Sequence, residues 1–216
     1  AVAISKTLFA GRSVLLVLSD GDGRGGLGMQ LVDPAKGSVR GEAVLESVHS
    51  SQISCIATDP IGTAAGHGGV GGELAILGSL DGCASIWRFM SSHYLPMRPR
   101  VRLAGHSGAA IVAVALSAAI NIAATVSLDR LCVYSIGNGN LIRVIEPPQN
   151  FLDLPDGCEI KTTFARAPAL AISVQGFIVA VCESRIQSSA SRNQDRNVTT
   201  LHLFSLEGVA LGSKPL

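Results

Sequence analysis

The stretch Gly78-Ser79-Leu80-Asp81-Gly82-Cys83-Ala84-Ser85-Ile86-Trp87-Arg88-Phe89 is followed, after a polar connector, by Leu103-Ala104-Gly105-His106. An apolar strand end meets a tight Asp-Gly turn, and an alternating strand then ends at Trp87. The Gly-His pair opens the next unit. This order predicts a repeated β-sheet unit, and it describes architecture rather than chemistry.

A second, imperfect copy of the pattern follows the Gly-His pair. Strands are expected at 111–116 and 122–127, Asp129 stands in the turn, and Tyr134 takes the place of Trp87. Strand pairs with a Gly-His corner and a turn aspartate are typical of WD40 propeller blades. The sequence therefore predicts an all-β fold, a partial WD40-type β-propeller with about four blades of a larger ring.

The repeat units divide residues 1–216 into blades and one connector. They are a degenerate blade at 10–48, a blade with Trp87 at 49–98, a blade with Tyr134 at 99–148, an irregular connector at 149–168 and a degenerate blade at 169–216. Segment 183–197 of the last unit is rich in Ser, Arg, Gln and Asn, and we expect it to be disordered.

Each of the two better-formed blades contains candidates for a hydrogen-bonded tetrad. A buried indole N–H needs an acceptor, a hydroxyl can pass the bond on, and a histidine held by the turn carboxylate completes the chain. Catalysis by Ser, His and Asp is the alternative interpretation, and we favour the structural one because the spacing recurs. The second turn is one residue shorter and lacks the indole, so we expect a weaker or rearranged network there. The predicted structural tetrads are His49, Ser79, Asp81 and Trp87 in one blade and His106, Ser127, Asp129 and Tyr134 in the next.

Composition narrows the class of protein. Hydrophobic residues make up 47% of the chain and charged residues 15%, so most strands are expected to be covered on both faces. A net charge of +1 argues against nucleic-acid binding. The 5 cysteines are odd in number and never in a C-x-x-C pair, which favours reduced thiols in a cytoplasmic protein and supports no metal site.

One apolar stretch, 109–128, is about as long as a membrane span. It is rich in alanine, contains Ser117, Asn121 and Thr125, and divides into two β-branched halves. We therefore predict two buried strands joined by a turn rather than a transmembrane helix.

Two further motifs resemble binding sites, and for both we prefer a structural interpretation. Residues 21–26 match G-x-G-x-x-G, but no helix-like pattern follows, so a hairpin tip is favoured over dinucleotide binding and no cofactor is expected. Arg98, Arg100 and Arg102 recur at period two and therefore point to one face of a strand. We favour charges that deter edge pairing, with contact to an acidic partner or lipid headgroups as the alternative.

Beyond this repeat pattern, several strings resemble the C-terminal WD40 region of BEACH-domain proteins, the neurobeachin and beige-like group. The resemblance covers most of 10–213, and the Gly-rich inserts at 21–28 and 62–72 depart from the family pattern. The strings that carry it are "RSVLL", "GGELAILGSLDGCASIWRF", "RVRLAGHS", "LDRLCVYSIGNGNLIRVIEPP", "AISVQGFIVAV" and "LHLFSLEGVALGS".

The resemblance implies a scaffold segment of a large protein in vesicle and membrane trafficking, with PH-like and BEACH domains upstream in the same chain. Expected partners are other proteins that bind the propeller rims and loops, with peripheral association with endomembranes. A generic WD40 adaptor in another complex, or lipid-headgroup binding through the basic strand, is the alternative. The sequence holds no G-x-S-x-G, H-E-x-x-H or phosphate-binding loop with its lysine, so no enzyme is expected.

Both termini of the sequence look cut from something larger. We therefore expect the intact protein to supply further blades, and the segment alone to fold poorly.

Overall fold

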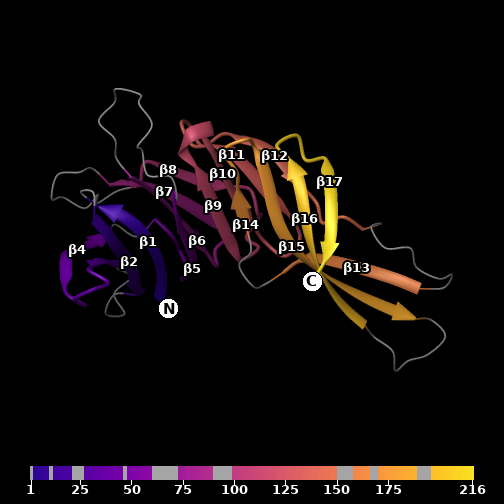
Figure 1. Ribbon diagram of the computed structural model, residues 1–216, viewed down its shortest axis with the longest axis horizontal. Helices are drawn as coiled ribbons and strands as arrows, with labels where there is room; N and C mark the ends of the chain where they lie inside the picture. The colour runs from indigo at the N-terminus through magenta and orange to yellow at the C-terminus, as the bar shows by residue number, and fades with distance from the viewer. Residues whose placement is uncertain are drawn as a thin grey trace.

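The described part of the computed structural model consists of antiparallel sheets that follow one another along the chain (Figure 1). The described residues are 2–9, 12–20, 27–45, 48–59, 73–89, 99–149, 158–165, 170–188 and 196–216. The glycine-rich segments 21–26 and 62–72, which carry the G-x-G-x-x-G match and one insert, lie outside them, as does Arg98.

Four sheets are formed by the described residues, and the first three have their strands in sequence order. The first sheet contains β1 (Val2–Phe9), β2 (Arg12–Asp20), β3 (Leu27–Val32) and β4 (Val39–Leu45). The second contains β5 (Ile53–Thr58), β6 (Glu73–Ser79), β7 (Cys83–Phe89) and β8 (Val101–Ala104). The third contains β9 (Ala113–Ser117), β10 (Ile122–Val126), β11 (Leu131–Ser135) and β12 (Leu141–Ile145).

The fourth sheet has one strand more than the others. It contains β13 (Cys158–Phe164), β14 (Leu170–Ile172), β15 (Phe177–Ser188), β16 (Arg196–Ser205) and β17 (Ala210–Pro215). Strand β15 is long enough to pair with two strands: residues 178–180 pair with β14, and residues 182–188 pair with β13. The strands β1, β5, β9 and β14 of successive sheets contact one another in turn, so they form the inner ends of four adjacent blades.

Residues 109–128 form two strands, which confirms the sequence prediction. Every residue of β9 and β10 is buried, and the turn between them is a short 3-10 element, η1 (Ala118–Ile120). Asn121 closes the turn in the left-handed region with φ 59°, a conformation that asparagine tolerates. Nowhere in the described ranges does a helix have the length and hydropathy needed to cross a bilayer.

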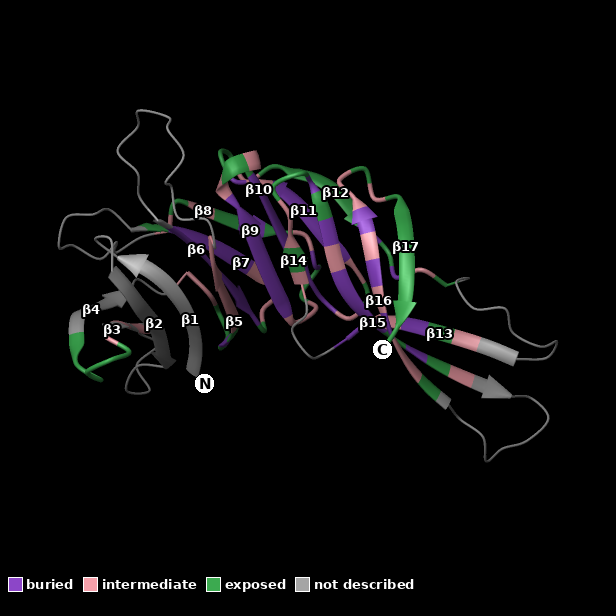
Figure 2. Cartoon of the chain, viewed as in Figure 1, coloured by how far each residue is buried: buried purple, intermediate pink, exposed green. Residues whose placement is uncertain are grey.

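The core lies between the sheets, where purple strands face each other in Figure 2. One cluster joins the second and third sheets and includes Ile76, Ile86 and Leu116, and another joins the third and fourth sheets and includes Val133 and Phe204. Burial on both faces explains why these strands have continuous apolar runs rather than strict alternation.

A glycine turn recurs where adjacent blades meet. Gly139, with φ +74°, lies in the β11–β12 turn, and a Cβ there would collide with Val101 of the preceding blade. Gly208, with φ +84°, lies in the β16–β17 turn and approaches Ile145 in the same way. Only glycine combines this backbone conformation with so close an approach. A polar contact also links the second and third sheets. Asp59, which follows β5, accepts a hydrogen bond of 3.2 Å through its Oδ2 from the N–H of Ala118.

The structure differs from the predicted boundaries in three places. β1 begins before residue 10, β13 lies inside the predicted connector 149–168, and β15 and β16 extend into the segment 183–197 that we expected to be disordered. Lys161 of β13 is exposed whereas Thr162 and Phe164 are buried. The inward-facing residues Ile160, Thr162 and Phe164 include two apolar side chains, but this alternation spans only a few residues and is interrupted by Thr162, so it is a weak periodic signal.

Candidate functional site

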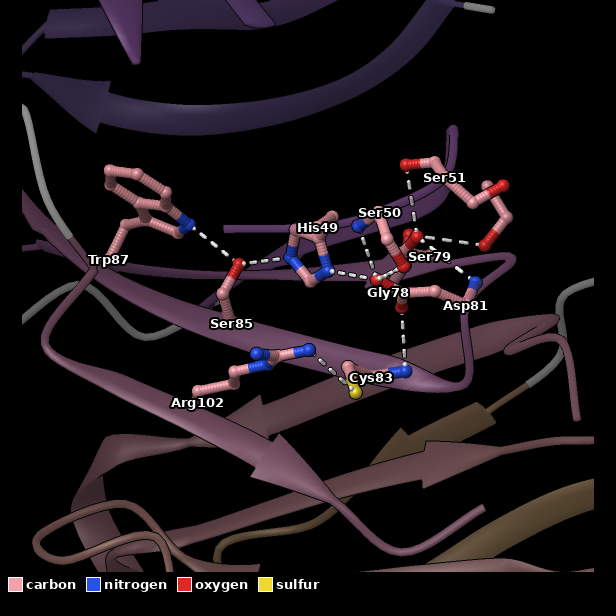
Figure 3. A network of polar contacts seen from close by, with 11 residues as sticks. His49, Ser50, Ser51, Gly78, Ser79, Asp81, Cys83, Ser85, Trp87 and Arg102 are labelled. Carbon is pink, nitrogen blue, oxygen red and sulfur yellow. Dashed lines mark hydrogen bonds and ion pairs between the residues drawn. The ribbon is translucent and has the colours of Figure 1, made fainter. Parts of the chain in front are cut away.

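The network around Trp87 is buried between β7 and the corner that precedes β5 (Figure 3). The Trp87 Nε1–H donates a 2.8 Å hydrogen bond to the hydroxyl of Ser85, and His49 Nε2 lies 2.8 Å from the same oxygen. On the other side of the ring, His49 Nδ1 lies 3.5 Å from Asp81 Oδ2. The chain of contacts therefore runs from indole to hydroxyl to imidazole to carboxylate.

Asp81 is held by the backbone of two loops. Its carboxylate accepts hydrogen bonds from the N–H of Ser50, at 2.8 Å, and of Cys83, at 2.9 Å. Burial opposes ionisation, but these N–H groups and nearby His49 outweigh it and lower the pKa of Asp81. Burial lowers the pKa of His49 despite the attraction of Asp81, so the ring favours its neutral form.

Ser79, the serine we predicted for this network, lies elsewhere. Its hydroxyl donates to the carbonyl of Ser51 and accepts from the N–H of Asp81, both at 3.2 Å, so it braces the turn. The hydroxyl between indole and imidazole is that of Ser85. Residues two apart on a strand share a face, so the spacing of Ser85 from Trp87 was the available signal.

The second network is arranged differently, although it also centres on a buried histidine. His106 Nε2 lies 2.6 Å from the hydroxyl of Thr125, and His106 Nδ1 lies 2.8 Å from that of Ser127. Ser127 in turn donates to Asp129 Oδ1 at 2.5 Å, so the aspartate is reached through a serine rather than directly. Asp129 also forms an ion pair with Arg130 at 2.9 Å.

Tyr134 occupies the position of Trp87 in this blade. Its ring is buried, and its hydroxyl lies beside Gly105. It makes no hydrogen bond of standard geometry within the described residues. The structure thus brings His106, Ser127 and Asp129 together, adds Thr125, and leaves Tyr134 at the end of the network as a packing residue.

A comparison of strand registers explains why the two networks differ. Ala75 pairs with Trp87 as Ala123 pairs with Tyr134, so the next inward-facing pairs, Leu77–Ser85 and Thr125–Cys132, are equivalent. In the second sheet the hydroxyl belongs to Ser85 on β7, whereas in the third it belongs to Thr125 on β10, the other strand of the equivalent pair. In the fourth sheet the equivalent pair is Ala180–His202, and His202 is buried against Phe204. Each of these three sheets therefore has one polar side chain at this cross-strand position.

The basic residues of the outer strand lie at the surface. Arg100 and Arg102 are both exposed, and the Arg102 guanidinium donates a 3.3 Å hydrogen bond to Cys83 Sγ. The third member of the predicted set, Arg98, lies outside the described residues. One arginine on an edge strand and one directly before it suit either protection of the edge or contact with an anion.

Exposed apolar side chains occur on and next to two outer strands, a feature that the sequence patterns did not single out. Ile142 is 49% exposed on β12, and Leu211 is 49% exposed on β17. Both strands are largely coloured as exposed in Figure 2. We call these outer positions the apolar rim, which consists of Leu141, Ile142, Val144, Val209 and Leu211. Exposed apolar side chains are candidates for contact with other molecules where they adjoin one another.

Two buried cysteines have a raised thiol pKa, and the described residues contain no cluster of metal-ligating side chains. Burial raises the pKa of Cys55 to about 11 and that of Cys182 to about 12, which keeps both as unreactive thiols. No three His, Cys, Asp or Glu side chains among these residues are close enough to share a metal ion.

No protein-family model and no curated protein matches this sequence. Among solved structures the fold is similar to that of U3-55K, a WD40 β-propeller protein, with a TM-score of 0.54 and 12% sequence identity. The match covers 98% of this chain and 64% of the U3-55K chain, so this chain spans less than two thirds of the length of U3-55K. At this identity the likeness concerns the fold alone. The chain is an all-β protein with the fold of a partial WD40-type propeller.

Ser85, rather than Ser79, is expected to be energetically coupled to Trp87. In a double-mutant cycle, Ser85→Ala and Trp87→Phe should show a coupling energy of about 1 kcal/mol or more, because either change alone leaves a buried group unpaired. The matched cycle of Ser79→Ala with Trp87→Phe should be additive within about 0.5 kcal/mol. Urea unfolding measures both cycles, and equal coupling for the two serines would contradict the assignment.

Stability is expected to fall as the pH drops from 6.5 to 4. Burial lowers the pKa of His106 from 6.5 to about 4, so in this window the unfolded chain takes up a proton that the folded chain refuses. Between pH 6.5 and pH 4 the free energy of unfolding should therefore fall by roughly 3 kcal/mol, at about 1.4 kcal/mol per pH unit, and above pH 6.5 this loss is absent. Unfolding free energy measured at several pH values should show a shallower slope for His106→Gln, and an unchanged slope for the exposed-site control Asn138→Gln. An identical slope in His106→Gln would refute this origin.

Proposed function

We propose that this chain is a non-catalytic segment whose outer strands and turns bind other proteins. One observation carries the proposal: the rigid sheets leave apolar side chains exposed on β12 and β17. In contrast, His106, Ser127 and Thr125 are buried and hydrogen-bonded to one another. A substrate has no access to them, so they serve the scaffold, and the surface is left for binding.

We further propose that the scaffold belongs to a BEACH-type protein of vesicle and membrane trafficking. The resemblance of the strings around Trp87, Tyr134 and Leu203 to that family supports this, and the propeller fold agrees with it. In such a protein the segment would act in the cytoplasm, peripheral to endomembranes, beside PH-like and BEACH domains of the same chain. A generic WD40 adaptor of another complex is the alternative, and the open reading frame upstream of residue 1 distinguishes the two.

Lipid-headgroup binding is a second candidate, favoured by two exposed arginines. Arg102 lies on β8 and Arg100 directly precedes this outer strand, where cations can reach an anionic surface. The Arg102 guanidinium is already engaged with Cys83, which reduces its availability. Salt-dependent binding of full-length protein to anionic liposomes, lost on Arg100→Gln plus Arg102→Gln, would support this candidate over protein binding.

Replacing a rim residue by a charged one should remove protein partners without unfolding the sheet. Ile142→Asp in the full-length protein places a charge where an apolar partner surface is expected, so partners measured by quantitative affinity purification should fall at least tenfold. Asn140→Asp is the matched control, because it adds the same charge to an exposed position of the same hairpin. Unchanged partner recovery with Ile142→Asp and with Leu211→Asp would contradict binding through the rim.

A further inference from the structure

The fourth sheet extends beyond the other blades as a three-stranded arm, which projects from the body in Figure 1. The arm consists of β13, residues 183–188 of β15 and residues 196–199 of β16. Cys158 pairs with Ser188 and Ile186 pairs with Arg196, whereas β17 pairs only with the part of β16 from Thr200 onward. In the described chain, β13 is therefore an edge strand with β15 as its one neighbour.

The backbone groups on the outer edge of β13 can be assigned residue by residue. The Thr162 N–H donates to Gln149 Oε1, and the Thr162 carbonyl accepts from Gln149 Nε2, so both groups face away from β15. The Phe164 N–H likewise donates outward, to the carbonyl of Leu128 at 2.9 Å. Because backbone groups alternate along a strand, those of Ile160 and Cys158 face outward as well.

Gln149 imitates one residue of a neighbouring strand. Its carboxamide offers the same donor and acceptor as a peptide group, and it bonds both backbone groups of Thr162 at 3.3 and 3.4 Å. These distances lie beyond the usual range for N–H···O bonds, so the pair is weak. The same amide also donates to the carbonyl of Pro147 at 3.0 Å, a bond that does not depend on β13. A true strand could therefore replace Gln149 at small cost.

Beyond Thr162 the edge continues without a partner from the described residues. The outward N–H and carbonyl groups of Ile160 and Cys158 meet no described backbone or side chain. An unpaired edge of this kind is a template for one more strand. With Gln149 displaced, the three outward-facing residues would present three N–H groups and three carbonyls to an added chain.

The charge on the arm indicates which strand would fit. Lys161, on the edge strand itself, is exposed and lies directly opposite exposed Arg185, with Glu183 two residues along on the same face. Opposite charges on neighbouring strands of a sheet attract each other, and Lys161 lies on the strand that an added chain would pair with. A strand added to β13 would place a side chain next to Lys161 on this face, where an acidic residue is favoured.

We propose that the outer edge of β13, residues 158–162, binds an extended peptide segment of a partner protein by β-addition. An acidic side chain of the peptide pairs with Lys161, and Gln149 holds the edge when the peptide is absent. This rests on the proposed protein-binding function and assigns it a site separate from the apolar rim.

The test uses full-length protein and two blocked eight-residue peptides of alternating Val and Thr, one with a central Glu and one with a central Lys. Fluorescence anisotropy should show tighter binding of the Glu peptide by at least fivefold. Gln149→Ala should tighten binding of the Glu peptide several-fold, because the imitation of a strand is removed. Lys161→Glu should reverse the preference between the two peptides.

Ile160→Pro removes an outward N–H while the bonds from β13 to β15 remain, and it should weaken binding at least tenfold relative to Ile160→Val, which retains the N–H. If Ile160→Pro lowers the thermal midpoint, Gln149→Ala and Lys161→Glu decide the outcome. Failure of the Glu peptide to bind both the native protein and Gln149→Ala overturns the proposal, as does equal binding by the two Ile160 variants. Partner loss in Ile142→Asp would still support the proposed function, so the two failures are distinguishable.

Discussion

The structure depends on one polar position inside each of its better-formed sheets. Burial on both faces removes water from the strands, so any polar group placed there needs a partner within the sheet. Ser85 on β7 and Thr125 on β10 meet this requirement at equivalent cross-strand pairs, although from different strands of the pair. Each hydroxyl is hydrogen-bonded to a histidine in the corner before the first strand of its sheet, so the bond joins segments that lie far apart in the sequence.

The same constraint engages serine, histidine and aspartate, residue types common in catalytic sites, in the interior of the sheets. His106 is neutral at ordinary pH because burial lowers its pKa, and both its ring nitrogens are already engaged by hydroxyls. The aspartates at the turns are held by backbone N–H groups, by serine or by arginine. In these two networks the serine hydroxyls, histidine rings and aspartate carboxylates therefore connect strands and turns.

Stacking of the sheets divides the surface into covered and open regions. Glycine turns bring the outer strand of one blade close to the next, and apolar clusters fill the space between sheets. Among the described residues, the open regions include the apolar rim on and beside β12 and β17, the basic edge at β8 and the arm of the fourth sheet. These surfaces differ in chemistry: the first is apolar, the second basic, and the third is the edge of a sheet.

The sequence alone determined the all-β class, the repeat, and the two strands at 109–128, because hydrophobic periodicity and turn residues are local signals. It also selected His49, Asp81, Trp87, His106, Ser127 and Asp129 as members of polar networks. Tertiary structure decided that Ser85 and Thr125 supply the hydroxyls, since either strand of a cross-strand pair can present one to the same histidine. It alone revealed β13 and the exposure of Ile142, because pairing at an edge and coverage by a neighbouring sheet depend on residues far apart in the chain.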